Sequence, residues 1–375
     1  MNEIVPIEPD KLADAPHPRF CPRVFGQDHA AADFLSAYNA GRLHHAWMIT
    51  GPKGVGKASL AWKIARFLLS QSQATSDGLF GEAALVPTTL ETPSDSPLAQ
   101  RIAALAEGRL LLCRRPWDDK SNRLKQDITV SEVRRLKRFF EFSAPDGGRR
   151  VVIIDAADEL NASAANALLK ILEEPPERTT LLLVAHRPMR LLPTIRSRCR
   201  TLACSRLAAD DMEWALAGAG FESSNIRHLA ALADGSVGEA IRLANHAGPE
   251  LYQKLVALFA AGAKMDRRAA AALADSCAGA KNAERYSLIL SLLQNLHYRL
   301  AAHGASRKLN EAATDELLIL GNLAPNPDAA RRWASLAAEL AARAQHAVAV
   351  NLDPSSVILD MLLKTDKLAG SLRAA

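Results

Sequence analysis

Residues 151–200 read VVIIDAADELNASAANALLKILEEPPERTTLLLVAHRPMRLLPTIRSRCR and decide the fold. Two apolar runs, at 151–154 and 181–184, are typical of strands that are buried on both faces of a sheet. The segment between them carries apolar residues at i, i+3, i+4 and i+7, which predicts a helix that Asn161 caps and Pro175 ends. Short strands that alternate with helices predict a parallel sheet covered on both faces.

The segment 51–57, GPKGVGK, follows another strand-like stretch and precedes a helical pattern that runs to about Ser70. Its spacing is G-x-x-x-x-G-K, in which glycines let backbone N–H groups approach phosphate oxygens and the helix N-terminus adds a positive dipole end. The lysine would reach the outer phosphates. The candidate nucleotide-binding residues are Gly51, Gly54, Gly56 and Lys57, followed by Ala58 and Ser59.

Position 58 departs from this motif. The lysine is normally followed by Ser or Thr, whose hydroxyl binds Mg²⁺. Here that residue is Ala58. Ser59 is a poor replacement, because it lies one position later and about 100° round the helix. The sequence therefore predicts a phosphate-binding fold, and it leaves tight binding of nucleotide open.

Length and composition are typical of a globular chain with two or three domains: 375 residues, 49% of them hydrophobic and 23% charged. The net charge of +5 is too small to indicate nucleic-acid binding by itself. It is unevenly placed, because residues 101–150 hold 13 basic and 7 acidic residues. The basic helix face at 134–138 is explained equally well by solvation and by a DNA contact.

The five cysteines form no C-x-x-C pair, which fits a reducing cytosol. Residues 1–22 hold prolines and acids rather than an apolar run, so we expect no signal peptide. No stretch reaches the roughly 18 apolar residues that a membrane span needs. We therefore expect a cytoplasmic protein without membrane contact.

Two strings carry a family resemblance: NALLKILEEPP at 166–176 and Ser197-Arg198-Cys199. Both resemble the bacterial sliding-clamp loader, a branch of the AAA+ ATPases. The resemblance implies an α/β fold with an AAA+ P-loop parallel sheet and a helical lid, followed by an all-α C-terminal collar domain. The implied domains are a P-loop-type α/β domain at 1–206, a helical lid at 207–247 and a helical collar for oligomerisation at 248–375. We expect Gly248-Pro249 to form a linker.

The resemblance also assigns a second, degenerate nucleotide motif. Asp155 matches the acid that supports Mg²⁺ in ATP-hydrolysing relatives, but the next residue, usually the Glu that orients the attacking water, is Ala156. His186 is a weak stand-in for a polar residue near the γ-phosphate, and a loop histidine without that role explains it as well. Gly238 stands where such relatives carry a lid arginine. Because positioning and charge stabilisation supply most of the catalysis in phosphoryl transfer, we expect little ATPase activity.

The four-cysteine zinc module of many relatives has no counterpart, because no cysteine lies between Cys21 and Cys113. We therefore expect no metal site and no zinc. No cofactor is certain, and residual binding of ATP or ADP stays open.

The resemblance implies a clamp-loader subunit of the DNA polymerase III holoenzyme in DNA replication. It would be a catalytically degenerate AAA+ stator that supplies an arginine finger, Arg198, in trans to a neighbour's ATP site during sliding-clamp loading. No ATPase activity is expected from the isolated chain, although it would be part of a DNA-directed DNA polymerase (nucleotidyltransferase) holoenzyme. The implied partners are the ATPase (gamma/tau) subunits and the delta subunit in a hetero-oligomeric ring, and indirectly the sliding clamp and primer-template DNA.

Alternative interpretations stay open. The chain could be an active AAA+ motor subunit of the clamp loader, or a stand-alone DNA-binding adaptor that uses the basic helix. Arg198 could instead pair with a nearby acid to fix its loop, a role that Arg196 or Arg200 would fill as well.

Overall fold

A computed structural model of the chain describes residues 8–12, 15–71, 86–141, 148–221, 226–260 and 265–373. Its contacts divide the chain into two compact units. Unit 1 comprises residues 1–220 and 235–238, and unit 2 comprises residues 221–234 and 239–375. The predicted lid segment, 207–247, contributes residues to both units. The domain boundaries expected from the resemblance are not tested by this division and stay predictions.

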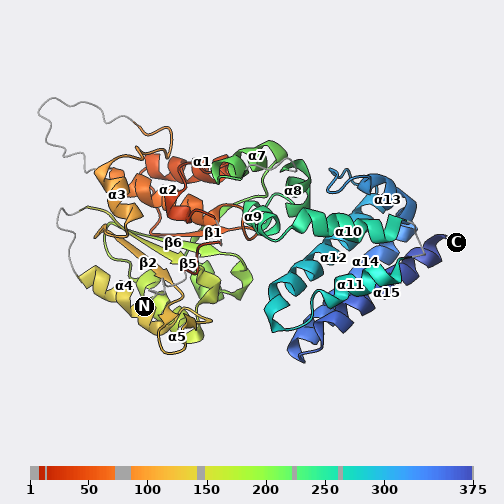
Figure 1. The fold of residues 1–375 in the computed structure, drawn as a ribbon. Coiled ribbons are helices and arrows are strands. Elements are labelled where there is room, and N and C mark those ends of the chain that lie inside the picture. Colours follow the sequence, from red (N-terminus) through yellow and green to blue (C-terminus); the bar gives the residue numbers. More distant parts are fainter. Residues whose placement is uncertain are drawn as a thin grey trace, which may run out of the picture. The chain divides into compact units, whose positions relative to one another are not determined.

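Unit 1 is built on a five-stranded sheet in the order β2-β5-β6-β1-β7, in which all neighbouring strands are parallel (Figure 1). The strands are β1 (Ala46–Thr50), β2 (Leu110–Arg114), β5 (Arg150–Asp155), β6 (Thr179–Ala185) and β7 (Arg200–Ala203). A short antiparallel pair, β3 (Trp117–Asp118) and β4 (Arg123–Leu124), follows β2. The fold-deciding stretch thus supplies two neighbouring strands, β5 and β6, and leads into β7 of the same sheet, and the predicted parallel sheet is confirmed.

Helices cover both faces of this sheet (Figure 1). On one face α2 packs on β5 and β6, while α1 packs on β7; on the other, α4 and α5 pack on each other and on the sheet. The helices and 3-10 turns of unit 1 are η1 (Pro18–Phe20), α1 (Asp28–Asn39), α2 (Lys57–Ser70), α3 (Pro97–Ala103), α4 (Val130–Glu141), η2 (Ala157–Glu159), α5 (Ala162–Glu173), η3 (Pro188–Arg190), α6 (Pro193–Arg196) and α7 (Ala209–Gly218).

The ends of α5 follow local rules. Asn161 accepts a hydrogen bond from the backbone N–H of Ala164, 2.9 Å away, and so caps the first turn. The helix ends at Glu173, two residues before the first proline, because the residue before a proline is disfavoured in helical conformation. Both predicted ends of α5 are confirmed.

The two faces of the sheet bury different sets of apolar side chains, which explains the uninterrupted apolar runs. Val152 and Ile154 of β5 belong to the core cluster under α4 and α5, together with Leu181 and Leu183 of β6. Strand β1 places Trp47 on the opposite face, where its ring lies 5.0 Å from that of Phe34 in α1. A strand buried on both faces needs apolar residues at every position rather than at every second one.

Unit 2 is helical throughout its described part (Figure 1). Its helices are α8 (Ile226–Ala233), α9 (Val237–Asn245, whose first two residues belong to unit 1), α10 (Gly248–Ala260), α11 (Arg267–Asp275), the 3-10 turn η4 (Ala280–Asn282), α12 (Ala283–Gly304), α13 (Glu316–Leu323), α14 (Pro327–Ala349) and α15 (Pro354–Arg373). The predicted linker at Gly248-Pro249 is wrong: both residues lie in the first turn of α10, where a proline removes no helical hydrogen bond.

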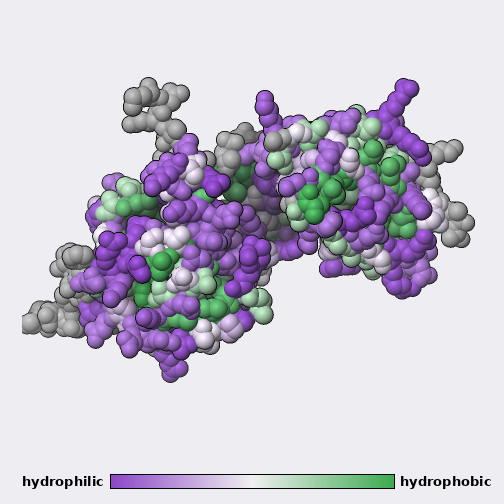
Figure 2. All heavy atoms as spheres, turned by 90° about the horizontal axis from the view of Figure 1, so that it is seen from below, coloured by the Kyte–Doolittle hydropathy of each residue, from purple (hydrophilic) through white to green (hydrophobic). Residues whose placement is uncertain are grey.

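Figure 2 shows a mainly hydrophilic surface on which hydrophobic residues gather in small patches. The exposed large apolar residues of unit 2 include Tyr298, Leu318, Val350, Leu352 and Leu363. None of the helices in the described ranges is long and apolar enough to cross a bilayer.

Candidate functional site

The phosphate loop at 51–57 lies at the carboxyl edge of the sheet, between the end of β1 and the start of α2. Parallel strands bring their carboxyl ends to one edge, so the ends of β5 and β6 lie at the same edge. Gly54 has a φ of +81°, and a Cβ atom there would lie 2.3 Å from the hydroxyl oxygen of Ser236. Only glycine fits that position, because both the backbone conformation and the available space exclude a side chain.

Lys57, the first residue of α2, is buried, and its ammonium group points back to its own loop. The Nζ atom donates a 2.8 Å hydrogen bond to the carbonyl of Gly51 and another to the carbonyl of Pro52. Burial lowers the pKa of Lys57 to about 8. The Lys57 side chain therefore connects the end of the loop to its beginning. Ala58 and Ser59 follow it on the helix, and both are half-buried.

The segment 236–238 packs directly on the outside of the loop. The backbone N–H of Gly238 donates a 2.9 Å hydrogen bond to the carbonyl of Gly54, and the Ser236 hydroxyl donates to the carbonyl of Lys53, also at 2.9 Å. A Cβ atom at position 238 would lie 2.8 Å from the Cα atom of Gly54. Where a lid arginine was expected in ATP-hydrolysing relatives, this chain has a backbone-to-backbone contact.

Asp155 ends β5 beside Arg114, the last residue of β2, in register with it. Its side chain is buried. Burial raises the pKa of Asp155 to about 7, and the charges of Asp10 and Glu159 add to this rise. A carboxyl group with this pKa is largely protonated below neutral pH, and a protonated carboxyl group is a poor ligand for Mg²⁺.

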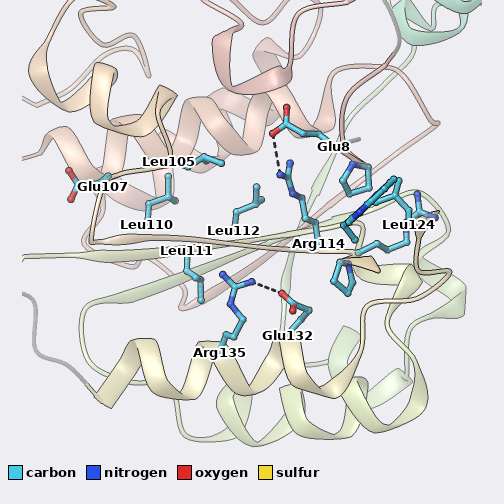
Figure 3. Close-up of a pocket in the computed structure, with 14 residues that line it drawn as sticks. Glu8, Leu105, Glu107, Leu110, Leu111, Leu112, Arg114, Leu124, Glu132 and Arg135 are labelled. Atoms are coloured by element: carbon cyan, nitrogen blue, oxygen red, sulfur yellow. Dashed lines mark hydrogen bonds and ion pairs between the residues drawn. The ribbon is translucent and has the colours of Figure 1, made fainter. Parts of the chain in front are cut away.

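Residues 8–12 lie against this edge of the sheet. Glu8 and Asp10 both pair with Arg114, and the Glu8 distance is 3.1 Å. Figure 3 shows Glu8 paired with Arg114 at the end of β2, with Leu112 and Leu110 further back along that strand, around a cavity of about 380 Å³. Asp10 also pairs with the buried His17 at 3.0 Å. The charges around Arg114 are thus mutually neutralised, and the cavity that they border has no surplus charge to attract a phosphate.

Asp158 lies in η2 and holds the loop that follows β6. Its carboxylate accepts hydrogen bonds from the backbone N–H groups of His186 at 2.8 Å and Arg187 at 3.2 Å. Burial lowers the pKa of His186 to about 4, and the charge of Lys57 adds to this. His186 is therefore neutral at physiological pH and offers no positive charge to a γ-phosphate.

Gln27 joins three segments around the loop. Its amide nitrogen donates to the carbonyl of Val55 at 3.0 Å and to that of Ser205 at 2.8 Å, and its amide oxygen accepts from the Ser205 N–H at 3.0 Å. The side chain is buried. Gln27 therefore fixes the loop to the chain that leaves β7.

Arg198 lies between α6 and β7, at the amino edge of the sheet. Its side chain is 37% exposed. The Nη2 atom lies 2.9 Å from Oε1 of Glu173, and Nη1 donates a 3.1 Å hydrogen bond to the carbonyl of Thr194. The sequence-based alternative, a pairing of Arg198 with a nearby acid, is therefore present in the free chain. This pairing leaves the guanidinium partly exposed.

The other two arginines of this segment are used differently. The guanidinium of Arg200 lies 4.9 Å from the ring centroid of Trp47, which is the geometry of a cation–π contact. Arg196 reaches the sulfur of Met189 at 3.0 Å. Cys199 packs against the core cluster, and burial raises its pKa to about 12. Of the three arginines, Arg200 is exposed while Arg196 and Arg198 are half-buried, and Arg198 is the one that pairs with an acid of its own chain in the described structure.

The residues at the loop fit a phosphate group but not the metal chemistry of ATP hydrolysis. The hydrogen bonds described for the loop use its carbonyl groups and leave the N–H groups of residues 53–57 available to an anion. Ala58 and Ala156 offer no oxygen in their side chains for Mg²⁺ or water. In the described part of the chain no three His, Cys, Asp or Glu side chains gather as a metal site. The expectation that zinc is absent stays a prediction.

The parallel sheet, the phosphate loop that follows β1 and the helical region that comes after the sheet define a P-loop protein of the AAA+ type. Residues 26–208 match the family described as "DNA polymerase III, delta subunit". The match spans just under half of the chain, and the resemblance inferred from residues 166–176 and 197–199 is confirmed over this part.

Curated relatives agree with this match. The chain is 37% identical over 201 residues to DNA polymerase III subunit delta' of Pseudomonas aeruginosa, which covers 53% of this chain and 55% of that protein. It is 34% identical over 176 residues to subunit gamma/tau of Mycobacterium bovis, covering 47% of this chain and 27% of that protein. The chain thus spans about half of the length of the delta' relative and about a quarter of the gamma/tau relative.

Solved structures match at low scores. A DNA polymerase III gamma subunit-related protein of Thermotoga maritima has a TM-score of 0.38 and 15% identity, covering 90% of this chain and 100% of that chain. A RuvB protein of the same organism has a TM-score of 0.37 and 17% identity, covering 60% and 64%.

Sequence reasoning found the loop, Asp155 and Arg198 but missed the residues that close the site. Gln27, Asp10 and Ser236 have no motif of their own, and they contact residues far away in the chain. Asp158 lies beyond the tip of β5 and outside any motif, yet it organises the loop after β6. These polar residues are marked by their burial next to the motif, and burial is not visible in a single sequence.

Proposed function

We propose that the chain is a catalytically degenerate subunit of the sliding-clamp loader of DNA polymerase III. It supplies Arg198 as an arginine finger to the ATP site of a neighbouring subunit. Its own phosphate loop serves the fold and carries out no hydrolysis. The proposal joins the family match of residues 26–208 to the positions of two sites within unit 1.

The observation that carries the proposal is the separation of Arg198 from the phosphate loop. The loop follows the end of β1, whereas Arg198 precedes the start of β7, which pairs parallel to β1. The two sites are therefore at opposite edges of one sheet, and a five-residue strand such as β1 spans roughly 17 Å. Arg198 cannot reach a phosphate on its own loop, and its exposed guanidinium is available to a neighbour.

The chemistry of arginine suits this role. Its guanidinium is always charged and presents a planar fork of donors that matches the spread charge of a transferring phosphoryl group. Arginine fingers contribute about 10³–10⁵ in rate in known phosphoryl-transfer systems. Arg198 uses two terminal nitrogens within its own chain, and the remaining donors stay available.

The state of the chain's own site argues against the alternative of an active motor subunit. A phosphate group bound here would be held by the loop N–H groups and by Lys57, which would have to leave the carbonyls of Gly51 and Pro52. Magnesium and the attacking water would find no ligand at Ala58 or Ala156. Residual binding of ATP or ADP is compatible with this site, whereas efficient hydrolysis is not.

The partners follow from the family. We propose assembly with the gamma/tau and delta subunits in a hetero-oligomeric ring, in the cytoplasm, where the complex loads the sliding clamp onto primer-template DNA. Unit 2 is the proposed assembly region. Its exposed apolar side chains, among them Leu318 and Leu352, are of the kind that subunit contacts bury.

The experiment is an ATPase assay of the purified chain alone and after addition of the gamma/tau and delta subunits. The chain alone is expected to show no more turnover than its Lys57→Ala variant, and turnover is expected in the mixture. Turnover by the chain alone that Lys57→Ala abolishes would establish an active motor and overturn the proposal.

A further inference from the structure

Arg198 is held in the free chain by a residue of the neighbouring helix. Glu173, the last residue of α5, lies 2.9 Å from Nη2 of Arg198, while the carbonyl of Thr194 accepts from Nη1. The carboxylate and the carbonyl bind different nitrogens of the same guanidinium. The finger is therefore folded against its own subunit through one ionic contact and one neutral contact.

The ionic contact is weak enough to be exchanged. The side chains of Arg198 and Glu173 are 37% and 49% exposed. Ion pairs at such exposed positions shift an equilibrium by about fivefold at most, because water screens the charges. A γ-phosphate carries more negative charge than one carboxylate and presents several acceptor oxygens, so it competes well for the same guanidinium.

The position of Glu173 at the end of a helix explains why its carboxylate attracts Arg198. Glu173 lies at the C-terminus of α5, where the helix dipole is negative, and Glu174 follows it directly. A carboxylate in this place is unfavourable by itself and gains from a nearby cation. Arg198 is thus drawn back to α5 whenever no stronger anion is present.

We propose that Glu173 is a positioning residue for the arginine finger, a counter-ion that holds Arg198 against α5 until a neighbour's phosphoryl group displaces it. This inference rests on the function proposed above for Arg198. Arg198 exchanges one hydrogen-bond acceptor, the Glu173 carboxylate, for another, and Glu173 takes part in no bond-making step. It lowers the rate of hydrolysis that the finger supports before the ring has closed on its substrate.

The first test measures the pair in the free chain. Phenylglyoxal modifies accessible guanidinium groups, and peptide mass spectrometry reads its reaction at Arg198 separately from other arginines. Glu173→Gln is expected to raise this reaction rate by up to about fivefold. Glu174→Gln is the matched control, because Glu174 forms no ion pair within the described ranges. Equal rates in the parent and in Glu173→Gln would overturn the proposal.

The second test uses the complete clamp loader and follows its ATPase without clamp or DNA. Glu173→Gln is expected to raise this unstimulated rate about two- to fivefold, and Arg198→Ala in the same chain is expected to remove the increase. Glu174→Gln is expected to match the parent.

The outcomes separate the two proposals. An unchanged or lowered rate in Glu173→Gln, with Arg198→Ala still reducing stimulated ATPase, would overturn the role of Glu173 alone. No effect of Arg198→Ala on stimulated ATPase would overturn the proposed function itself. An increase in Glu173→Gln that persists in the double variant would also overturn the role of Glu173, because it would not act through Arg198.

Discussion

The backbone N–H of Gly238 lies 2.9 Å from the carbonyl oxygen of Gly54 and donates a hydrogen bond to it. This contact brings a segment more than 180 residues away in the chain onto the phosphate loop. It depends on the absence of a side chain at both positions. The loop is therefore held by two sets of hydrogen bonds. The segment that contains Gly238 contacts its outer side, and Lys57 connects its two ends.

Gly238→Ala should disrupt this contact. The new Cβ atom would lie 2.8 Å from the Cα atom of Gly54 and 3.2 Å from Leu12, so backbone must move. We expect a loss of about 1–3 kcal/mol in the free energy of unfolding, as for other overpacked sites. Urea denaturation measures it. Gly218→Ala is the control, since its Cβ atom would meet Phe25 at an ordinary 3.8 Å; similar losses in both variants would contradict the close contact.

Asp155 should make stability depend on pH. Its folded pKa of about 7 is above the reference value of 3.8. The folded chain therefore keeps a proton that the unfolded chain loses, and the stability that Asp155 contributes falls as the pH rises from about 4 to about 7. Asp155→Asn removes this loss, so the variant should gain stability relative to the parent between pH 4 and pH 8.

The control for this pH series is Asp118. Its pKa is lowered, first by a hydrogen bond with Ser121, so Asp118→Asn should show the opposite trend. Chemical denaturation at several pH values gives both curves. A difference between Asp155→Asn and the parent that stays constant from pH 4 to pH 8 would show that the carboxyl group is not perturbed.

A buried ion pair should hold unit 2 together. Arg299 Nε lies 2.6 Å from Glu316 Oε1, which also accepts a 2.6 Å hydrogen bond from the hydroxyl of Tyr252. Burial raises the pKa of Tyr252, with the charge of Glu316 adding to it. Glu316→Gln leaves the arginine charge buried without its counter-ion, and we expect a loss of about 3–5 kcal/mol.

Thermal and urea unfolding of the full chain test this expectation. Asp360→Asn is the comparison, because it breaks an ion pair with Arg343 that is about half exposed. It should change stability little. If both variants unfolded at the same denaturant concentration, the buried ion pair would contribute no more to the free energy of unfolding than the exposed one, which would contradict this prediction.

Local features of the fold were predictable because they depend on neighbouring residues. Asn161 caps α5 through a side-chain bond three residues away, and the prolines after Glu173 end that helix. The apolar runs of β5 and β6 required burial on both faces. Strand order was not predictable in this way, because the pairing of β1 with β6 and β7 joins segments more than 130 residues apart.

The site was predictable only where it follows a motif. The loop at 51–57 and Arg198 lie in short, recognisable strings. The contacts that close the site are long-range: Gln27 meets Ser205, and Ser236 meets Lys53. The linker predicted at Gly248 and Pro249 was wrong, because both residue types interrupt many helices but suit the first turn of one.

The role of Arg198 as a finger for a neighbour is the central claim, and one substitution tests it most directly. The clamp loader is assembled with the Arg198→Ala chain, and its ATPase is measured with sliding clamp and primed DNA. Arg200→Ala serves as control, since Arg200 stacks on Trp47 of its own chain. We predict normal assembly and a fall of about 10³-fold or more in hydrolysis at the receiving site, with a much smaller change for Arg200→Ala. Parental ATPase and clamp loading by the Arg198→Ala complex would contradict the account.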